Sequence, residues 1–318
     1  MHCSPLGDSD NISCFMLNDL KYIAAELTKS GLNIPNTSNK RELHSIISQH
    51  MEKSNNCNEE SCWVGTNIAK QFKDRFVPIM PDIWREKPSE WLNTNDIDNV
   101  LNQYAKAYKN FHYGGAVPID FDLKGNDNYC EVSNICKISI PKLDKKGVKK
   151  IGMVFNTDPS TKGGEHWISC IIDIDGIDAN KLLGGAPSSG KKTKKRKRKR
   201  KRKSKERKKV KTKEKFYGMY FFDSVGDPAP KEVKKLFNRL KEQLKKHNGK
   251  DLQFIENDVP HQLGNNECGV YCIYFITNML KGRSFFDIVE DIKRDKDMHE
   301  FRKVYFRSKK NEKQNNNN

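Results

Sequence analysis

The segment from Gln262 to Cys268 places an amide side chain six residues before a cysteine. Gly264, Asn265 and Asn266 predict a turn, and the apolar run after Cys268 predicts a mostly buried helix. Cys268 is therefore expected at a helix amino terminus, where unpaired backbone N–H groups and the positive end of the helix dipole favour thiolate over thiol. The pattern predicts a nucleophilic cysteine, which still needs a general base.

His166 is the best candidate for that base. It stands just before the β-branched apolar run Ile168 to Ile174 and is expected at the edge of a core strand. Asp223 ends the next strand-like run, Tyr217 to Phe222. If these two strands are neighbours, the carboxylate and the imidazole lie side by side at one edge of a sheet. His261 is a weaker candidate, because it belongs to the same loop as the cysteine.

These residues resemble a known family, the adenain-like and SUMO-protease-like cysteine peptidases, in which histidine, aspartate, glutamine and cysteine follow one another in this order. A second motif, Trp91-Leu92-Asn93, looks like the family's segment that helps to line the substrate groove. The resemblance covers roughly residues 60 to 307. It implies a general base, a carboxylate that fixes the base's tautomer, an oxyanion-hole amide and a nucleophile, which are His166, Asp223, Gln262 and Cys268.

Each of these residues taken alone also has a structural interpretation, because a lone cysteine, histidine or aspartate usually serves the fold. The conjunction of four residue types at strand ends and a helix start, in the family's order, favours catalysis. Cys272 lies one turn beyond Cys268, but its apolar neighbours predict a core position.

Members of this family commonly cut after glycine pairs. Trp91 and Trp167 could form flat walls of a narrow channel that admits backbone without side chains, although both could equally be core residues. The chain contains Gly184-Gly185-Ala186 in what is expected to be an exposed loop, so self-cleavage after Gly185 is a hypothesis. Tyr113 to Ala116 contains the same trio and is a candidate buried turn.

One segment carries nearly all of the net charge. The chain has 59 Lys and Arg against 41 Asp and Glu, a net charge of +18, and residues 191–215 alone hold 19 basic residues against 2 acidic ones. Such a run cannot bury enough apolar surface to offset its ordering entropy, and we expect it to be disordered when free. A nuclear-import signal and a merely solvated loop are the alternatives.

The expected partner of this insert is DNA or RNA, bound through phosphates with strong salt dependence. The chemistry itself requires no cofactor, but a nucleic-acid or peptide activator is compatible with the family resemblance. The residues expected to contact nucleic acid are Lys194, Lys195, Arg196, Lys197, Arg198, Lys199, Arg200, Lys201, Arg202 and Lys203.

The amino-terminal residues 1–55 predict a small helical module. Apolar residues recur at helical spacing from Leu17 to Leu27, and a second helix is expected from Asn39, with Glu42 completing a capping box. Lys40 and Arg41 at its start give a weak likeness to a SAP-type nucleic-acid-binding module. A plain helical hairpin that packs on the protease or recruits substrate is the alternative.

Nine cysteines are present, an odd number, and their spacing does not match a zinc site. With no secretory signal and no apolar run long enough to span a bilayer, the sequence favours a reducing compartment. Cys3, Cys14 and Cys170 are then expected to be free thiols.

Together these patterns predict an α+β fold of the papain-like, adenain and SUMO-protease type, with a central mixed sheet packed against the helix that carries Cys268. A helix is expected over residues 96–111, a sheet region over 129–224, a basic amphipathic helix over 230–247 and a strand over 251–257. The predicted domains are the helical module 1–55, a protease domain 56–308 with the insert at about 186–215, and a disordered tail 309–318.

The predicted activity is peptide hydrolysis by a cysteine endopeptidase. The Asn- and Lys-rich composition and the likeness to viral members favour a large DNA virus protease that matures core or capsid precursors after Gly-Gly, located in the virion and the host cytoplasm, with the nucleus as an alternative. The rival functions are a deconjugase of a ubiquitin-like modifier, an acyltransferase, and an inactive nucleic-acid-binding virion protein.

Overall fold

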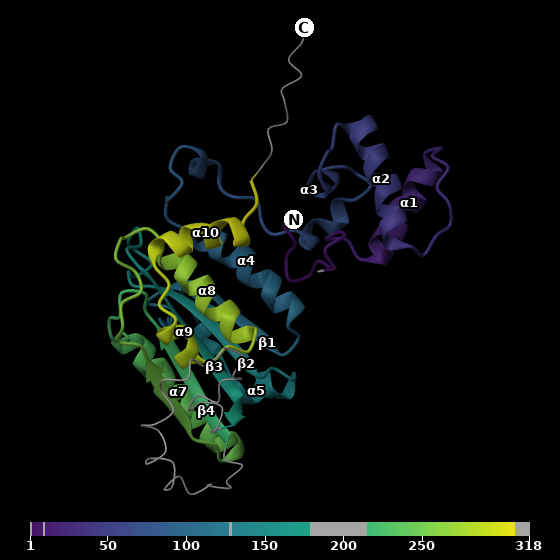
Figure 1. Ribbon diagram of the computed structural model, residues 1–318. Coiled ribbons are helices and arrows are strands. Elements are labelled where there is room, and N and C mark those ends of the chain that lie inside the picture. Colours follow the sequence, from purple (N-terminus) through teal and green to yellow (C-terminus); the bar gives the residue numbers. More distant parts are fainter. Residues whose placement is uncertain (1, 9, 127–128, 179–214, 309–318) are drawn as a thin grey trace, which may run out of the picture.

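A five-stranded mixed sheet forms the centre of the molecule (Figure 1). In this computed structural model, which describes residues 2–8, 10–126, 129–178 and 215–308, the strand order follows the chain. The central strands pair antiparallel, whereas each outer strand pairs parallel with its neighbour. The strands are β1 (Phe111–Pro118), β2 (Lys150–Asn156), β3 (Trp167–Asp178), β4 (Lys215–Phe222) and β5 (Leu252–Glu256).

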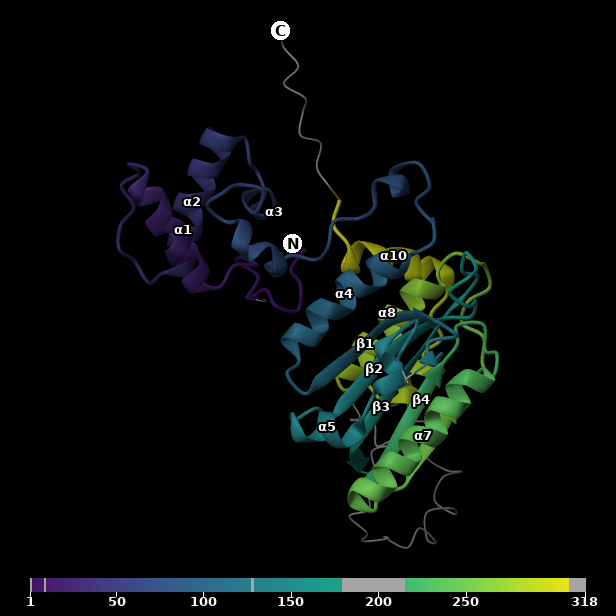
Figure 2. The ribbon, with the colours of Figure 1, turned by 180° about the vertical axis from the view of Figure 1, so that it is seen from behind.

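Helices cover both faces of this sheet and also form a separate amino-terminal group (Figures 1 and 2). The predicted α+β class, with a mixed sheet packed against the cysteine helix, is confirmed. The helices, including three short 3-10 segments, are α1 (Leu17–Lys29), α2 (Lys40–Asn55), α3 (Glu60–Trp63), η1 (Lys70–Arg75), η2 (Asp82–Arg85), α4 (Thr94–Ala107), η4 (Asn134–Lys137), α5 (Ile140–Lys145), α7 (Lys231–Asn248), α8 (Cys268–Leu280), α9 (Phe285–Glu290) and α10 (Asp295–Tyr305).

Helix α8 packs on one face of the sheet, and it also contacts α4 and α10. All its residues except Asn278 are buried. This burial on all sides explains why the sequence of α8 is apolar throughout and has no polar stripe. The rings of Phe275 and Phe222 stack with centroids 5.0 Å apart and fix the helix on β4. Close contact with the Trp91 segment needs a glycine, because a Cβ at Gly269 would lie 2.9 Å from the Cβ of Leu92.

The opposite face of the sheet is covered by α7 and α5. The apolar stripe of α7 is buried at Val233, Leu236, Leu240 and Leu244, as its helical spacing predicts. Because both faces of the sheet are covered, the residues of β3 from Trp167 to Ile174 are all buried rather than alternately buried and exposed.

The helices α1 and α2 form the expected hairpin, and Asn39 caps α2 by accepting hydrogen bonds from the backbone N–H groups of Arg41 and Glu42. The reciprocal half of a capping box is not formed, since the Glu42 carboxylate accepts from Thr37 Oγ1. The hydrophobic cluster of this group continues through Trp63 to Phe76. The domain boundary at residue 55 therefore stays a prediction.

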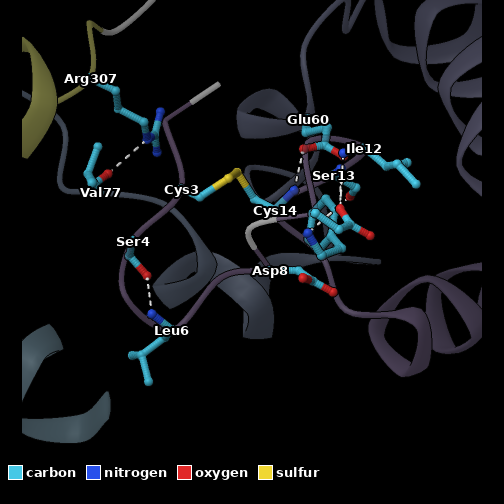
Figure 3. Close-up of a disulfide and its surroundings, with 12 residues drawn as sticks. Cys3, Ser4, Leu6, Asp8, Ile12, Ser13, Cys14, Glu60, Val77 and Arg307 are labelled. Carbon is cyan, nitrogen blue, oxygen red and sulfur yellow. Dashed lines mark hydrogen bonds between the residues drawn. A yellow bond between two sulfur atoms is a disulfide. The ribbon is translucent and has the colours of Figure 1, made fainter. Parts of the chain in front are cut away.

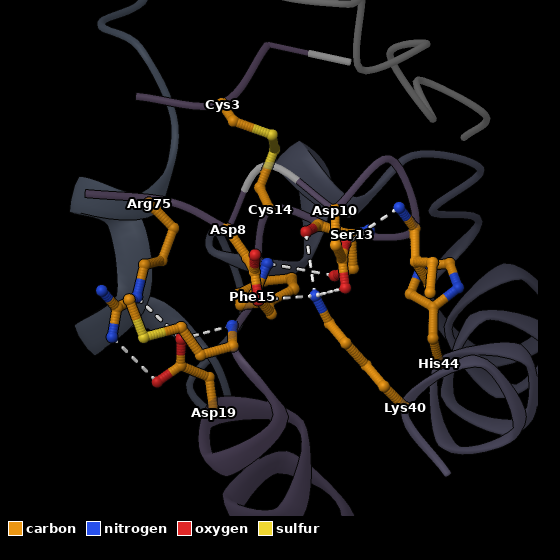
Figure 4. Close-up of polar contacts among 12 residues, drawn as sticks. Cys3, Asp8, Asp10, Ser13, Cys14, Phe15, Asp19, Lys40, His44 and Arg75 are labelled. Atoms are coloured by element: carbon orange, nitrogen blue, oxygen red, sulfur yellow. Dashed lines mark hydrogen bonds and ion pairs between the residues drawn. A yellow bond between two sulfur atoms is a disulfide. The ribbon is translucent and has the colours of Figure 1, made fainter. Parts of the chain in front are cut away.

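Lys40 is not a free phosphate ligand. Its ammonium pairs with Asp8 at 3.1 Å and Asp10 at 2.8 Å, and it also donates to the carbonyl oxygen of Ser13 (Figure 4). Arg75 similarly makes two hydrogen bonds to Asp19, at 2.7 and 3.0 Å. These pairs tie the amino-terminal segment to the helices and weaken the case for a nucleic-acid-binding module at this position.

The expectation that Cys3 and Cys14 are free thiols is wrong. They form a disulfide (Figure 3), and two further disulfides join Cys57 to Cys62 and Cys130 to Cys136. Residues 2–4 run back along the segment 75–77 with backbone hydrogen bonds, which brings Cys3 beside the cysteine eleven positions later. Sequence spacing does not reveal this return of the chain. Cys170 is a free, buried thiol, as predicted.

Two predicted boundaries are also corrected. The helix expected over residues 96–111 ends at Ala107, and Phe111 begins β1, so the sheet starts earlier than residue 129. The glycine pair in β1 suggests a turn but forms a register shift between Tyr113 and Ala116, with Gly115 at a φ of +102°. The basic insert up to residue 214, the Gly184-Gly185-Ala186 site and the tail lie outside the described residues. Across the ranges that are described, no helix has the length and apolar character needed to cross a bilayer.

Candidate active site

The hairpin of β3 and β4 brings His166 and Asp223 together. His166 directly precedes β3 and Asp223 directly follows β4, and these antiparallel strands pair Ser169 with Phe222. The two side chains consequently meet at the same edge of the sheet, with 2.8 Å between His166 Nε2 and Asp223 Oδ1. The predicted juxtaposition is therefore present.

Further hydrogen bonds fix Asp223 and the loop before His166. Asp223 is buried, and its backbone N–H and C=O bond to the Asn257 amide at 2.9 and 2.7 Å. Asp223 Oδ1 also accepts from the backbone N–H of Val225. On the other side, Asn156 Oδ1 accepts from the backbone N–H of Glu165, which fixes the loop before His166.

Cys268 is the first residue of α8 and is only 1% exposed. Its thiol lies close enough to the His166 ring to affect the charge of that ring. Because Nε2 faces Asp223, Nδ1 is the ring nitrogen left for the thiol. Burial lowers the pKa of His166, but hydrogen bonds and charge attraction from Asp223 and Cys268 outweigh it and raise the pKa from 6.5 to about 10. This environment favours an imidazolium beside the sulfur.

Gln262 is buried with its amide orientation fixed. The Ser224 hydroxyl donates to Gln262 Oε1 at 2.7 Å, and Gln262 Nε2 donates to the carbonyl oxygen of Gly264 at 2.9 Å. The Ser224 carbonyl oxygen accepts the backbone N–H groups of His261 and Gln262, both at 2.8 Å. One hydrogen of the Gln262 NH₂ group therefore remains to donate to a reacting oxygen.

Helix α10 anchors the loop that leads to Cys268. Asp295 Oδ2 accepts from the backbone N–H groups of Leu263 and Gly264 at 3.0 and 2.8 Å. Asp295 Oδ1 lies 3.3 Å from the Tyr271 hydroxyl on α8. The loop is thereby fastened to two helices at once.

A buried ion pair lies immediately before the cysteine. Arg302 Nε donates to Glu267 Oε2 at 2.7 Å, and both side chains are at most 5% exposed. The same guanidinium donates to the carbonyl oxygens of Glu90 and Asn266, and it lies over the Trp84 ring at 4.5 Å. Arg302 therefore joins the cysteine loop to the segment that ends at Trp91.

The two tryptophans proposed as substrate walls differ in exposure. Trp91 is 37% exposed, and its Nε1 donates to Asn266 Oδ1 at 3.2 Å, which places it beside the cysteine loop. Trp167 is 6% exposed, and its Nε1 donates to the carbonyl oxygen of Leu92 at 2.8 Å. Trp91 can face a substrate directly, whereas Trp167 supports the Trp91 segment from the core.

Three residues that support the site, Ser224, Asn257 and Arg302, are not predicted from the sequence. Ser224 could have been found because it follows Asp223, but the pairing of Arg302 with Glu267 has no local signal. His261 is fully buried, with Nε2 3.2 Å from the carbonyl oxygen of Val289, which agrees with its rejection as a base. The predicted nucleic-acid contacts Lys194 to Lys203 lie outside the described residues and stay a prediction.

Comparison with known proteins agrees with this geometry. The family model of the Ulp1 protease family, C-terminal catalytic domain, matches residues 139–316, more than half of the chain. The chain is 26% identical to a thiol protease of Acanthamoeba polyphaga mimivirus over 79% of this chain and 68% of that protein. It is 23% identical to a cysteine protease of African swine fever virus over 84% of this chain and 88% of that protein.

The fold is similar to a crystal structure of the African swine fever virus protease. The TM-score is 0.59 at 19% sequence identity, and the match covers 97% of this chain and 96% of the viral protease. On the family match over β2 to β5 and α8, together with the thiol and cysteine protease relatives, the chain belongs to the Ulp1 protease family and is a cysteine protease.

Proposed function

We propose that the protein is a cysteine endopeptidase that cleaves precursor proteins after Gly-Gly pairs, with His166, Asp223, Gln262 and Cys268 as its catalytic residues. The observation that carries this proposal is the contact of His166 with both Asp223 and the Cys268 thiol at the start of α8. A buried thiol without a neighbouring base would only fill space in the hydrophobic core.

In the proposed reaction, the Cys268 thiolate attacks the carbonyl carbon of the scissile peptide bond. The resulting oxyanion accepts hydrogen bonds from the Cys268 backbone N–H and from the free N–H of the Gln262 amide. His166 then donates its proton to the departing amine, and the carbon–nitrogen bond breaks. Water next attacks the acyl-enzyme with His166 as base, and the proton returns to the sulfur as the acid leaves.

The preference for glycine is supported by the position of Trp91. Its partly exposed ring is held against the cysteine loop by the bond to Asn266. An aromatic wall at this position leaves room for a substrate backbone but not for large side chains beside the scissile bond. The support of Leu92 by Trp167 keeps that wall in place.

The viral origin of both named relatives supports a role in virion maturation. We propose that the substrates are viral core or capsid precursors, cut in the virion or in the host cytoplasm. Nucleic acid bound by the basic insert, or a peptide, is the proposed activator.

A second candidate function is removal of a ubiquitin-like modifier. It is favoured by one observation, that some of the viral relatives are named SUMO-1 cysteine protease. Such a substrate offers a folded domain before its Gly-Gly tail, whereas a precursor offers an extended chain. The two functions therefore differ in what must precede the glycine pair.

The proposal is tested by mass spectrometry of products from Gly-Gly-Ala peptides and from a SUMO fusion carrying the same junction. We expect cleavage after the second glycine in peptides. Cys268→Ala should lower kcat/KM at least ~10³-fold, because the nucleophile is lost. Each reaction is run with and without DNA, and DNA should increase the rate.

The matched control is Cys272→Ala, which removes another buried thiol one turn along the same helix. It should keep most of the activity. If the SUMO fusion is cleaved and the peptides are not, the deconjugase function replaces the precursor protease function. If Cys268→Ala remains active, both proposed functions are wrong.

A further inference from the structure

A second concentration of basic residues lies on the folded part of the chain. Residues 231–250, which contain α7, hold eight Lys and Arg against two acidic residues. Residues 137–150, which contain α5, hold six against one. The chain outside these two segments and the insert 191–215 holds 26 basic residues against 36 acidic ones, so positive charge is segregated to α5 and α7.

The two helices lie side by side over the same face of the sheet (Figure 2). The Gln243 side chain of α7 bonds to the backbone of Ile138 and Ile140 at the start of α5. His247 also bonds to Asp144, with 3.0 Å between the two side chains. Since α7 buries its apolar stripe against the strands, its basic residues must project outward.

Most of these outward lysines are not neutralised by neighbours. Within the described ranges, seven exposed lysines of α5, α7 and the residue after α5 form no ion pair with a carboxylate, whereas Lys231, Arg239 and Lys241 pair with Glu232, Asp122 and Asp251. We name the exposed, unpaired set the α5/α7 lysine face: Lys142, Lys145, Lys146, Lys234, Lys235, Lys245 and Lys246.

The spacing of the face fits a repeating anion. The pair Lys234 and Lys235 and the pair Lys245 and Lys246 are eleven residues apart on α7, or roughly 16 Å along the helix axis. Double-stranded DNA carries one charge per about 1.7 Å of its axis, so several phosphates fall within this span.

We propose that the α5/α7 lysine face binds the phosphate backbone of nucleic acid. A membrane surface is less suitable, because a membrane-binding helix presents large apolar residues beside its lysines. Phe237, a large apolar residue of α7, is partly buried against the sheet. The surface depends neither on the insert nor on peptidase activity.

The face lies on the side of the sheet opposite α8, so bound nucleic acid leaves the Cys268 site open. The enzyme can therefore be retained on a nucleic acid while it cuts proteins packed around it. Binding at this face localises the protease and takes no part in its chemistry.

The test measures fluorescence anisotropy of a labelled DNA duplex titrated with the full chain at several salt concentrations. The variant replaces Lys234, Lys235, Lys245 and Lys246 by Gln. We expect at least a tenfold loss of affinity at low salt and a salt slope that is smaller by about two to four, since each lost phosphate contact removes about 0.9. Peptide cleavage without DNA should be unchanged, which separates this result from the proposed function.

The matched control removes the same charge elsewhere, from four exposed lysines without a carboxylate partner in the described part of the chain: Lys53, Lys70, Lys109 and Lys124. It should keep the wild-type affinity to within about threefold. An equal loss in both variants, or no loss in either, overturns the proposal. So does tighter binding to vesicles of anionic phospholipid than to the duplex.

Discussion

At the scale of single residues, the site depends on charge held in place by buried hydrogen bonds. Asp223 is fixed through its backbone by Asn257, and it holds His166 by one ring nitrogen. A histidine whose pKa is raised from 6.5 to about 10 adds folding stability that is fully present below about pH 6.5 and is lost as the pH rises through 10. Its proton is thus available across the neutral range.

Asp223→Asn should reduce kcat and move the alkaline limb of the kcat/KM profile to lower pH. The reason is that the carboxylate no longer raises the pKa of His166, while burial continues to lower it. We expect a loss of about 10²- to 10⁴-fold in kcat, measured with a Gly-Gly-Ala peptide between about pH 5 and 10. Asp227→Asn, an exposed carboxylate four residues later, is the control and should leave the profile unchanged. An unshifted alkaline limb in Asp223→Asn would contradict this assignment.

At the scale of elements, α10 holds the site together although it carries no catalytic residue. Its Arg302 reaches Glu267, Asn266 and the carbonyl oxygen of Glu90, and its Asp295 reaches the Leu263 segment. The loop that leads to Cys268 contains no helix or strand. These contacts therefore take the place of the backbone hydrogen bonds that a strand would provide.

Arg302→Met should destabilise the protein by about 3–5 kcal/mol, because it leaves the Glu267 carboxylate buried and unpaired. The measurement is the free energy of unfolding in urea. Adding Glu267→Gln should recover part of the loss. Lys303→Met, which breaks an exposed pair on the same helix, should change stability by less than about 1 kcal/mol. An equal loss of stability in Arg302→Met and Lys303→Met would contradict a special role of the buried pair of Arg302 with Glu267.

Local pattern explains why some elements were predictable. Long buried apolar runs, such as α8 and the first part of β3, and the strand ends beside His166 and Asp223 follow from the local hydrophobic pattern. The return of residues 2–4 along 75–77, the bulge at Gly115 and the Arg302 pair depend on contacts between distant segments. Those contacts are decided by packing, which a linear pattern does not contain.

At the scale of the whole molecule, two redox states of cysteine coexist in one chain. Three disulfides join six cysteines, whereas Cys170, Cys268 and Cys272 are free. The Cys3–Cys14 disulfide joins the amino-terminal segment to the residues just before α1 (Figure 3). Cys268, the proposed nucleophile, must stay reduced while disulfides hold this group of helices.

Iodoacetamide labelling of air-oxidised protein in denaturant should modify three cysteines per chain, and nine after reduction. The reason is that only a free thiolate is alkylated. Intact mass spectrometry counts the labels, and peptide mapping should place the first three on Cys170, Cys268 and Cys272. Nine labels without reductant would show that the disulfides do not form.

The hairpin of β3 and β4 separates two ends of the molecule. His166 and Asp223 stand at one end, whereas the segment that joins the strands leaves from the other, roughly 25 Å away for eight residues of strand. Since strand pairing already fixes the register, the length of that connection is free to vary without disturbing the active site. The same junction is therefore a suitable attachment point for a fluorophore or an affinity tag in a working enzyme.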